Sequence, residues 1–167
     1  MQKIELITRK LSLKQILHEL EENHILINHY AKEYFRHPLF YDTEQEVLSV
    51  FITSLSEIGM KDGGTLNEIR GKISELGMKP CNPSAGFLLR LAWVDQPPSS
   101  NSVLSGTHKA PDMAVTVLSD ILEPDDSFPK GLYLRNVDGR LWLRGYVCDD
   151  TFRFDPADMF AVQKASS

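Results

Sequence analysis

The chain has 167 residues, of which 42% are hydrophobic and 25% are charged, and its formal net charge is −5. This length and composition are typical of one folded domain and exclude an intrinsically disordered chain. No apolar run approaches the roughly 18 residues of a transmembrane helix, and the charged start "MQKIELITRKL" lacks the apolar core of a signal peptide. Two cysteines make no disulfide framework, so we expect a cytoplasmic protein with reduced thiols.

The first half of the sequence predicts helices. Ser12 and Gln15 form an S-x-x-Q capping box, in which each side chain satisfies a backbone donor at a helix start. Apolar residues at helical spacing follow it, which predicts one amphipathic helix over residues 13–36 that ends before Pro38. Before the box, alternating apolar and charged residues predict a short strand over residues 2–8.

Two further capping boxes predict two further helices. The T-x-x-E boxes of residues 43–46 and 65–68 precede apolar residues at helical spacing, and we expect these helices to end at Gly59 and Gly77. The apolar run of residues 83–94 fits a buried helix or a buried strand, and the Asn-Pro pair before it favours a helix.

The second half predicts strands. Residues 95–112 are rich in Pro, Ser and Gly and predict a loop or linker. The segments after it that alternate as strands do are 114–118, 132–137, 140–148, 151–154 and 159–163. The resulting expectation is an α+β fold, in which an N-terminal helical part of three to four helices (residues 1–94) packs on a small C-terminal antiparallel sheet (residues 113–164) within one compact domain.

The stretch "LYLRNVDGRLWLRGY" predicts a hairpin with a distinctive outer face. An Asp-Gly turn fixes the strand pairing, so leucines gather on one side of the hairpin. On the other side Tyr133 faces Arg144 and Arg135 faces Trp142, with Tyr146 beside them. We call these five residues the Arg/aromatic face. Paired arginines and aromatics also occur on the surfaces of sheets that bind nothing. Whether this face binds a partner therefore depends on whether its side chains are exposed to solvent.

Candidate catalytic residues are few. Cys81 precedes an expected helix start, where a thiol pKa is lowered, and His108 lies in the predicted loop as a base for it. No known nucleophile signature or phosphate-binding loop surrounds them. The His and acidic spacings match no metal motif, and no cofactor motif is present, so we expect neither a metal nor a cofactor.

The function expected from these residues is that of an interaction or regulatory protein, which binds a protein or peptide through the Arg/aromatic face. A small hydrolase or transferase that uses Cys81 and His108 is the alternative. Nucleic-acid binding through the helical part is a second alternative, which is disfavoured because its candidate recognition helix "GFLLRLAWV" offers only Arg90. The acidic balance of residues 112–158, five Lys/Arg against ten Asp/Glu, disfavours nucleic-acid binding by the C-terminal half. The amphipathic helices leave self-association open, and no membrane partner is expected.

Overall fold

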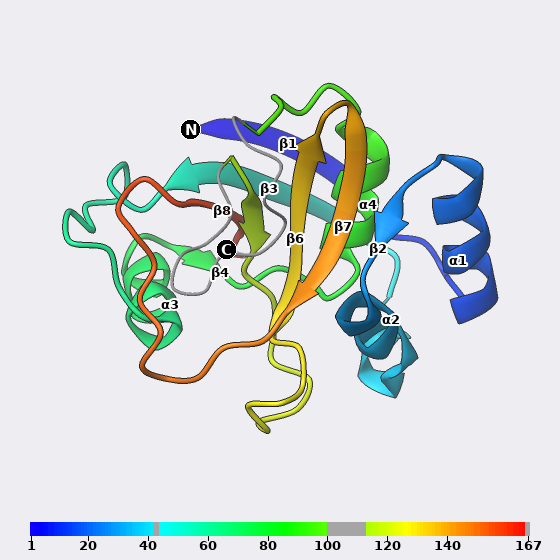
Figure 1. Cartoon of the computed structure of the whole chain (residues 1–167). Helices are drawn as coiled ribbons and strands as arrows, with labels where there is room; N and C mark the ends of the chain where they lie inside the picture. The colour runs from blue at the N-terminus through cyan, green and yellow to red at the C-terminus, as the bar shows by residue number, and fades with distance from the viewer. Residues whose placement is uncertain (42–43, 100–112, 166–167) are drawn as a thin grey trace.

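The computed structural model describes residues 1–41, 44–99 and 113–165. Within these residues the strands form one mixed sheet in the order β1-β3-β8-β5-β6-β7-β2, with β4 beside β8 (Figure 1). In chain order the elements are β1 (Gln2–Ile7), α1 (Leu13–Glu22), β2 (Leu26–Ile27), α2 (His29–Arg36), the 3-10 turn η1 (Pro38–Tyr41), β3 (Val47–Ser54), α3 (Leu66–Glu75), β4 (Met78–Lys79), α4 (Ala85–Ala92), β5 (Val115–Val117), β6 (Gly131–Val137), β7 (Arg140–Tyr146) and β8 (Met159–Lys164).

This sheet shows that the expected α+β arrangement is wrong. In place of a small C-terminal antiparallel sheet, the described residues form an eight-stranded mixed sheet whose strands span the chain. The strands β1, β2, β3 and β4 come from the part expected to be helical, and β5 runs parallel to β8. The two halves of the chain therefore share one sheet.

The helix expected after residues 43–46 is the strand β3. Its apolar residues fit a helical period, but Leu48, Val50 and Ile52 also alternate, and it is these three that are buried. Thr43 of the expected capping box lies outside the described residues. Glu46 pairs with Thr8 instead of capping a helix, since its carbonyl accepts a hydrogen bond of 2.9 Å from the Thr8 amide.

The single helix expected over residues 13–36 is broken into α1 and α2. The break lies at His24, whose φ of 57° cannot continue a helix, and β2 follows it. Ser12 caps α1 as predicted, and its Oγ accepts a hydrogen bond of 3.2 Å from the Gln15 amide. Asn28 caps α2, where its Oδ1 accepts from the Ala31 amide at 3.0 Å.

Other predicted elements are confirmed. Helix α3 lies after the 65–68 box, and α4 shows that residues 83–94 contain a helix. Strands β1, β5, β6, β7 and β8 occupy predicted segments, whereas residues 151–154 contribute an isolated bridge of Phe154 to Gly64 and no strand. Of the predicted linker, residues 100–112 lie outside the described residues.

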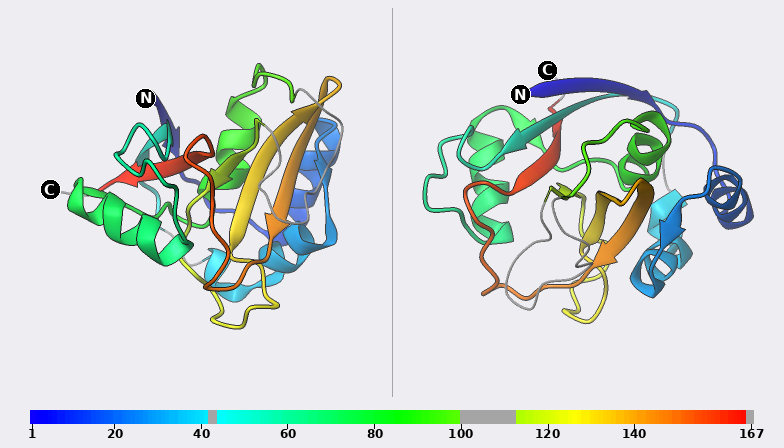
Figure 2. Two further views of the ribbon diagram at one scale, coloured as in Figure 1. Left: turned by 60° about the vertical axis from the view of Figure 1, so that its left-hand side comes forward. Right: turned by 45° about the horizontal axis from the view of Figure 1, so that its top comes forward.

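The sheet curls around α4. This helix packs against β1 at one margin of the sheet and against β6 and β7 near the other, which requires the sheet to bend around it (Figure 2). The inner core joins residues of α1, α2 and α4 to one side of the sheet, and α3 packs on the other side in a second core. Successive residues of β8 illustrate this division, because Ala161 belongs to the first core and Phe160 and Val162 belong to the second.

Candidate functional site

The β6–β7 hairpin has the turn and the pairing that the sequence predicts. Asp138 and Gly139 adopt positive φ angles of 53° and 81°, as a type I′ turn requires. Tyr133 lies opposite Arg144, and the other predicted pairs are present as well. The leucines face the inner core, so the Arg/aromatic face lies on the outer side of the curled sheet.

Arg144 connects two aromatic residues of this face. Its guanidinium carbon lies 5.0 Å from the centre of the Trp142 ring, and its Nε donates a hydrogen bond of 2.8 Å to the Tyr133 hydroxyl. Arg144 thus makes its cation–π contact with Trp142, which lies on the same strand. Tyr133, which lies opposite Arg144 on β6, accepts a hydrogen bond from it. Arg135 donates from its Nε to the Ser99 hydroxyl at 2.7 Å.

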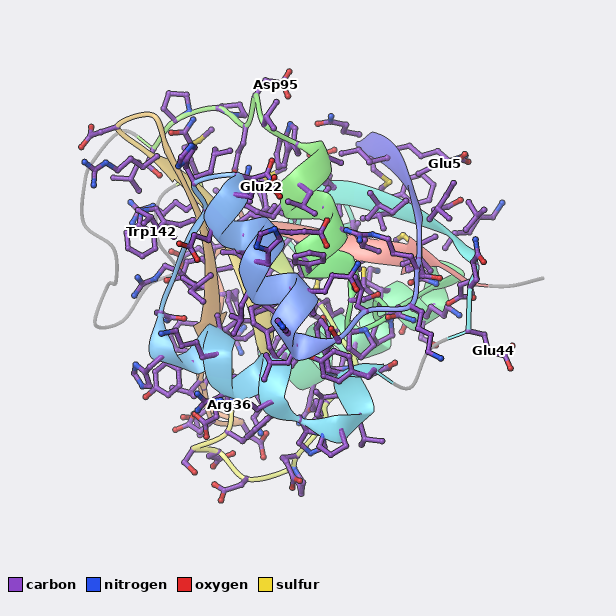
Figure 3. The ribbon with its side chains drawn as sticks, turned by 90° about the vertical axis from the view of Figure 1, so that its right-hand side faces the viewer. Glu5, Glu22, Arg36, Glu44, Asp95 and Trp142 are labelled. Carbon is purple, nitrogen blue, oxygen red and sulfur yellow. The ribbon has the colours of Figure 1, made fainter. Side chains whose placement is uncertain are left out.

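Burial divides the Arg/aromatic face into two parts. Tyr133 is 7% exposed and Arg135 is completely buried. Trp142, Arg144 and Tyr146 are half-buried. Figure 3 shows Trp142 on β7 at one side of the molecule, well away from Glu5 on β1. A partner in solution therefore has access to Trp142 and Arg144 first.

Three buried hydrogen-bond donors lie together at the Tyr146 end of this face. The Tyr146 hydroxyl and the Nε of Arg70 are buried and have no hydrogen-bond partner among the residues that the structure describes, and the buried Tyr34 hydroxyl interacts with the Ser119 side chain. We call these three residues the donor cluster. The other end of the Arg70 guanidinium donates to the Ser119 carbonyl at 2.6 Å. Most buried polar groups in proteins are paired, so donors gathered in one place can serve an acceptor that a ligand brings.

Two glycines make this arrangement sterically feasible. A Cβ on Gly145 would lie 2.6 Å from the Tyr30 carbonyl carbon, so only glycine lets α2, which carries Tyr34, approach β7 this closely. A Cβ on Gly131 would lie 3.3 Å from the Tyr146 hydroxyl, so this glycine makes room for the Tyr146 ring. The sequence alone did not indicate the donor cluster, because Tyr34 occupies one of the apolar positions of the predicted amphipathic helix.

The donor cluster is buried and lies near charged side chains of both signs. Burial raises the pKa of the Tyr34 hydroxyl, and Ser119 beside it opposes this effect. Burial likewise raises the pKa of the Tyr146 hydroxyl. The pKa of the nearby Asp120 carboxyl is raised by partial burial and lowered by Arg70 and Lys79. Both hydroxyls therefore stay protonated, and two cations face one carboxylate.

The structure does not favour the proposed cysteine nucleophile. The Cys81 side chain is fully buried, and its Sγ lies 3.6 Å from the Ala161 carbonyl oxygen, to which the thiol donates. Burial raises the pKa of this thiol, whereas an active nucleophile needs a lowered one. His108 lies outside the described residues, so its distance from Cys81 is not defined.

The described residues of the helical part do not favour a metal site or a nucleic-acid site. His18 and Glu22 lie 3.6 Å apart on the exposed side of α1, yet the described residues contain no group of three or more His, Cys, Asp and Glu that could hold a metal. Arg90, the one basic residue of α4, is completely buried, and burial lowers its pKa to about 10. Its guanidinium donates a hydrogen bond of 2.6 Å to the Gln96 Oε1, so Arg90 stabilises the buried interior of the protein.

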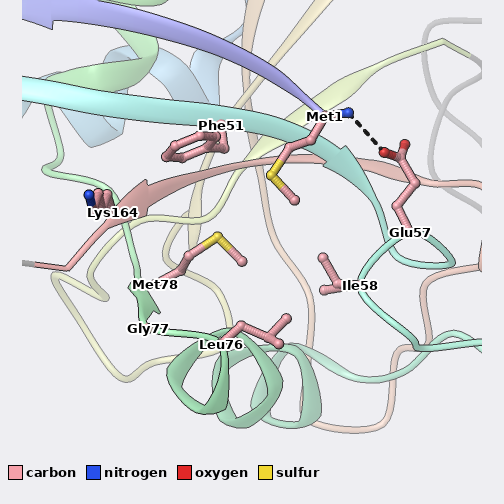
Figure 4. Close-up of a pocket in the computed structure, with 8 residues that line it drawn as sticks. All are labelled: Met1, Phe51, Glu57, Ile58, Leu76, Gly77, Met78 and Lys164. Carbon is pink, nitrogen blue, oxygen red and sulfur yellow. Dashed lines mark ion pairs between the residues drawn. The ribbon is translucent and has the colours of Figure 1, made fainter.

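An open groove lies on the outer side of β3, beside β4 and the end of α3 (Figure 4). It has a volume of about 470 Å³. Its lining is mostly apolar and consists of Met1, Phe51, Glu57, Ile58, Leu76, Gly77, Met78 and Lys164. The Glu57 carboxylate pairs with the amino group of Met1 at 3.1 Å. A groove with this lining is suited to apolar side chains.

No family model, no curated protein and no solved structure matches this chain. None of the described helices is long and apolar enough to cross a membrane. The geometry of the donor cluster and of the Arg/aromatic face therefore carries the functional argument.

Proposed function

We propose that this chain is a binding protein that takes up an acidic peptide segment of a partner protein along the Arg/aromatic face. The observation that carries the proposal is the donor cluster, in which the Arg70 Nε and the Tyr146 hydroxyl have no partner in the described part of the chain and the Tyr34 hydroxyl lies near them. A carboxylate accepts hydrogen bonds only, so it complements a site made of donors. Such charge-assisted bonds are about twice as strong as neutral ones.

The half-buried part of the face supports the choice of a peptide. Tryptophan and arginine are the residue types on which protein interfaces most often depend. The stacked pair of Trp142 and Arg144 offers an apolar surface and a cation side by side. From Trp142 to Tyr146 the strand rises by about 13 Å, which matches about four residues of an extended peptide.

A chain of contacts links this surface to the donor cluster. Arg144 is bonded to Tyr133, whose ring centre lies 6.5 Å from that of Tyr146. Tyr146 in turn interacts electrostatically with Arg70 and Tyr34. A peptide that stacks on Trp142 can thus direct an acidic group toward Tyr146 and Arg70.

The test uses synthetic peptides in place of an unknown partner. A library of tetrapeptides with blocked ends is made twice, once with Asp and Glu and once with the amides Asn and Gln in their place, and the binding of each peptide is measured by fluorescence anisotropy. We expect acid peptides to bind and their amides to bind at least 10-fold more weakly, because a lost charge-assisted bond is worth about 1.5–3 kcal/mol. Equal binding of acids and amides, or no binding of either, would contradict the proposal.

Variants locate the site. Arg144→Met and Tyr146→Phe should each weaken the selected acid peptide at least 10-fold. Arg140→Met is the matched control, because Arg140 begins the same strand and is exposed at the turn. The proposal fails if Arg140→Met weakens binding as much as Arg144→Met does.

A further inference from the structure

Strand β1 leaves one edge of the sheet open. It is the last strand in the sheet order and pairs only with β3 (Figure 2). Among the described residues no segment pairs with its other edge. An open edge offers unpaired backbone donors and acceptors to another strand.

The register of β1 shows which backbone groups point outward. Thr8 donates to Glu46 across the β1–β3 pair, and antiparallel partners alternate between hydrogen-bonded and non-bonded pairs. The even-numbered residues of β1 therefore bond to β3. The N–H and C=O groups of Lys3, Glu5 and Ile7 point toward the open edge.

We propose that β1 pairs with β1 of a second copy of this chain, antiparallel and about a two-fold axis at Ile4. In this register Lys3 lies opposite Glu5 of the second copy, and Glu5 lies opposite its Lys3. The two strands exchange backbone hydrogen bonds through the outward groups, and two sheets become one. This inference is independent of the peptide-binding proposal, since β1 and the Arg/aromatic face lie in different parts of the molecule.

Charge selects this register over its neighbours. A two-fold axis at Lys3 would set Lys3 against its own copy, and an axis at Glu5 would set Glu5 against its own copy. Like charges directly opposite each other destabilise a strand pair, and opposite charges stabilise it by about 0.2–1 kcal/mol. Only the axis at Ile4 makes both charged pairs complementary.

The apolar residues of β1 fit the same register. Met1 is 61% exposed and Ile7 is 62% exposed, and the axis at Ile4 places Met1 opposite Ile7 of the second copy. Met1 also lines the apolar groove on the outer side of β3 (Figure 4). Pairing therefore brings an exposed isoleucine to the mouth of an open apolar groove.

Pairing of two β1 strands costs the monomer little intramolecular stabilisation. Lys3 and Glu5 form an ion pair of 3.3 Å within one copy, but both side chains are more than half exposed. Exposed ion pairs contribute little to stability, so the dimer loses little when the two intramolecular pairs, one in each copy, are exchanged for two cross-strand pairs.

Sedimentation equilibrium tests the pairing. We expect the wild type to show a monomer–dimer equilibrium, and Glu5→Lys to weaken the dimer at least 10-fold, because lysine then faces lysine at both charged pairs. The double variant Lys3→Glu/Glu5→Lys restores opposite charges and should return the dissociation constant to within about threefold of the wild type. Glu22→Lys is the control, because it makes the same charge change on the exposed side of α1, far from Glu5 (Figure 3).

The results separate a dimer from a change in folding. Circular dichroism and thermal unfolding establish that each variant is folded. A wild type that stays monomeric at the highest attainable concentration would overturn the proposal. A double variant that dimerises no better than Glu5→Lys would overturn it as well.

Cross-linking tests the register directly. Opposite residues of a non-bonded antiparallel pair have Cα atoms about 4.5 Å apart, which lies within the range for a disulfide. With Cys148→Ser as the background, Ile4→Cys should form a covalent dimer on mild oxidation, whereas Lys3→Cys, which faces Glu5, should not. The reverse outcome would refute the axis at Ile4.

Discussion

The side chain of Asn28 pairs with the backbone of Gly145 as a neighbouring strand would. Its Nδ2 donates to the Gly145 carbonyl at 3.0 Å, and its Oδ1 accepts from the Gly145 amide at 2.8 Å. The same Oδ1 accepts from the Ala31 amide and caps α2. One side chain thus starts α2 and fastens it to β7, which places Tyr34 near Tyr146.

Asn28→Ala should lower the free energy of unfolding by about 2–4 kcal/mol, because it removes a helix cap and leaves both backbone groups of Gly145 unpaired. Ser12→Ala is the control, since Ser12 caps α1 through a single exposed bond and its loss should cost about 1 kcal/mol. Urea unfolding measures both values. Equal losses for the two variants would mean that the Asn28–Gly145 pair contributes nothing.

Gly145→Ala and Gly71→Ala should change stability in opposite directions. At Gly145 the added Cβ would lie 2.6–2.8 Å from the backbone and side chain of Tyr30, so α2 must move away from β7. We expect a loss of about 3 kcal/mol or more, in the range of severe overpacking. At Gly71 nothing lies within 4 Å, so alanine should stabilise α3 by about 0.5–1 kcal/mol. A Gly145→Ala protein as stable as the wild type would contradict the close approach.

Two tyrosines should respond in opposite ways to loss of the hydroxyl. The Tyr146 hydroxyl is buried without a partner among the described residues, so Tyr146→Phe should stabilise the ligand-free protein by about 1 kcal/mol. The Tyr41 hydroxyl donates to the Phe35 carbonyl at 2.6 Å, so Tyr41→Phe should destabilise it by about 1 kcal/mol. Thermal unfolding gives both values. Destabilisation by Tyr146→Phe would mean that the free protein already provides an acceptor for this hydroxyl.

Local signals in the sequence predicted local structure well. An Asp-Gly turn of two residues fixes the register of a hairpin, which is why every pair between β6 and β7 could be predicted. The caps at Ser12 and Thr65 were predicted for the same reason, since a cap involves residues only three apart.

Long-range pairing was what the sequence did not reveal. In β3 the apolar residues satisfy both a helical and a strand period, and pairing with β1 and β8 decides between them. The donor cluster depends on contacts between α2, α3 and β7, whose residues are far apart in the chain. Of the Arg/aromatic face, the sequence predicted the membership and the pairing but not the burial of Arg135.

The two thiols should make the protein less stable at alkaline pH. Burial raises the pKa of the Cys148 thiol from 9.0 to about 11, and burial raises the pKa of Cys81 as well. Between pH 9 and 11 the unfolded chain releases the Cys148 proton and the folded chain keeps it. The folded state then binds more protons, so the free energy of unfolding falls as the pH rises through this range. Cys148→Ala should make this fall less steep in urea titrations between pH 8 and pH 11, and an unchanged slope would contradict the assignment.

At pH 8 a thiol reagent should label Cys81 only after the protein unfolds, because the protonated, fully buried thiol is unreactive.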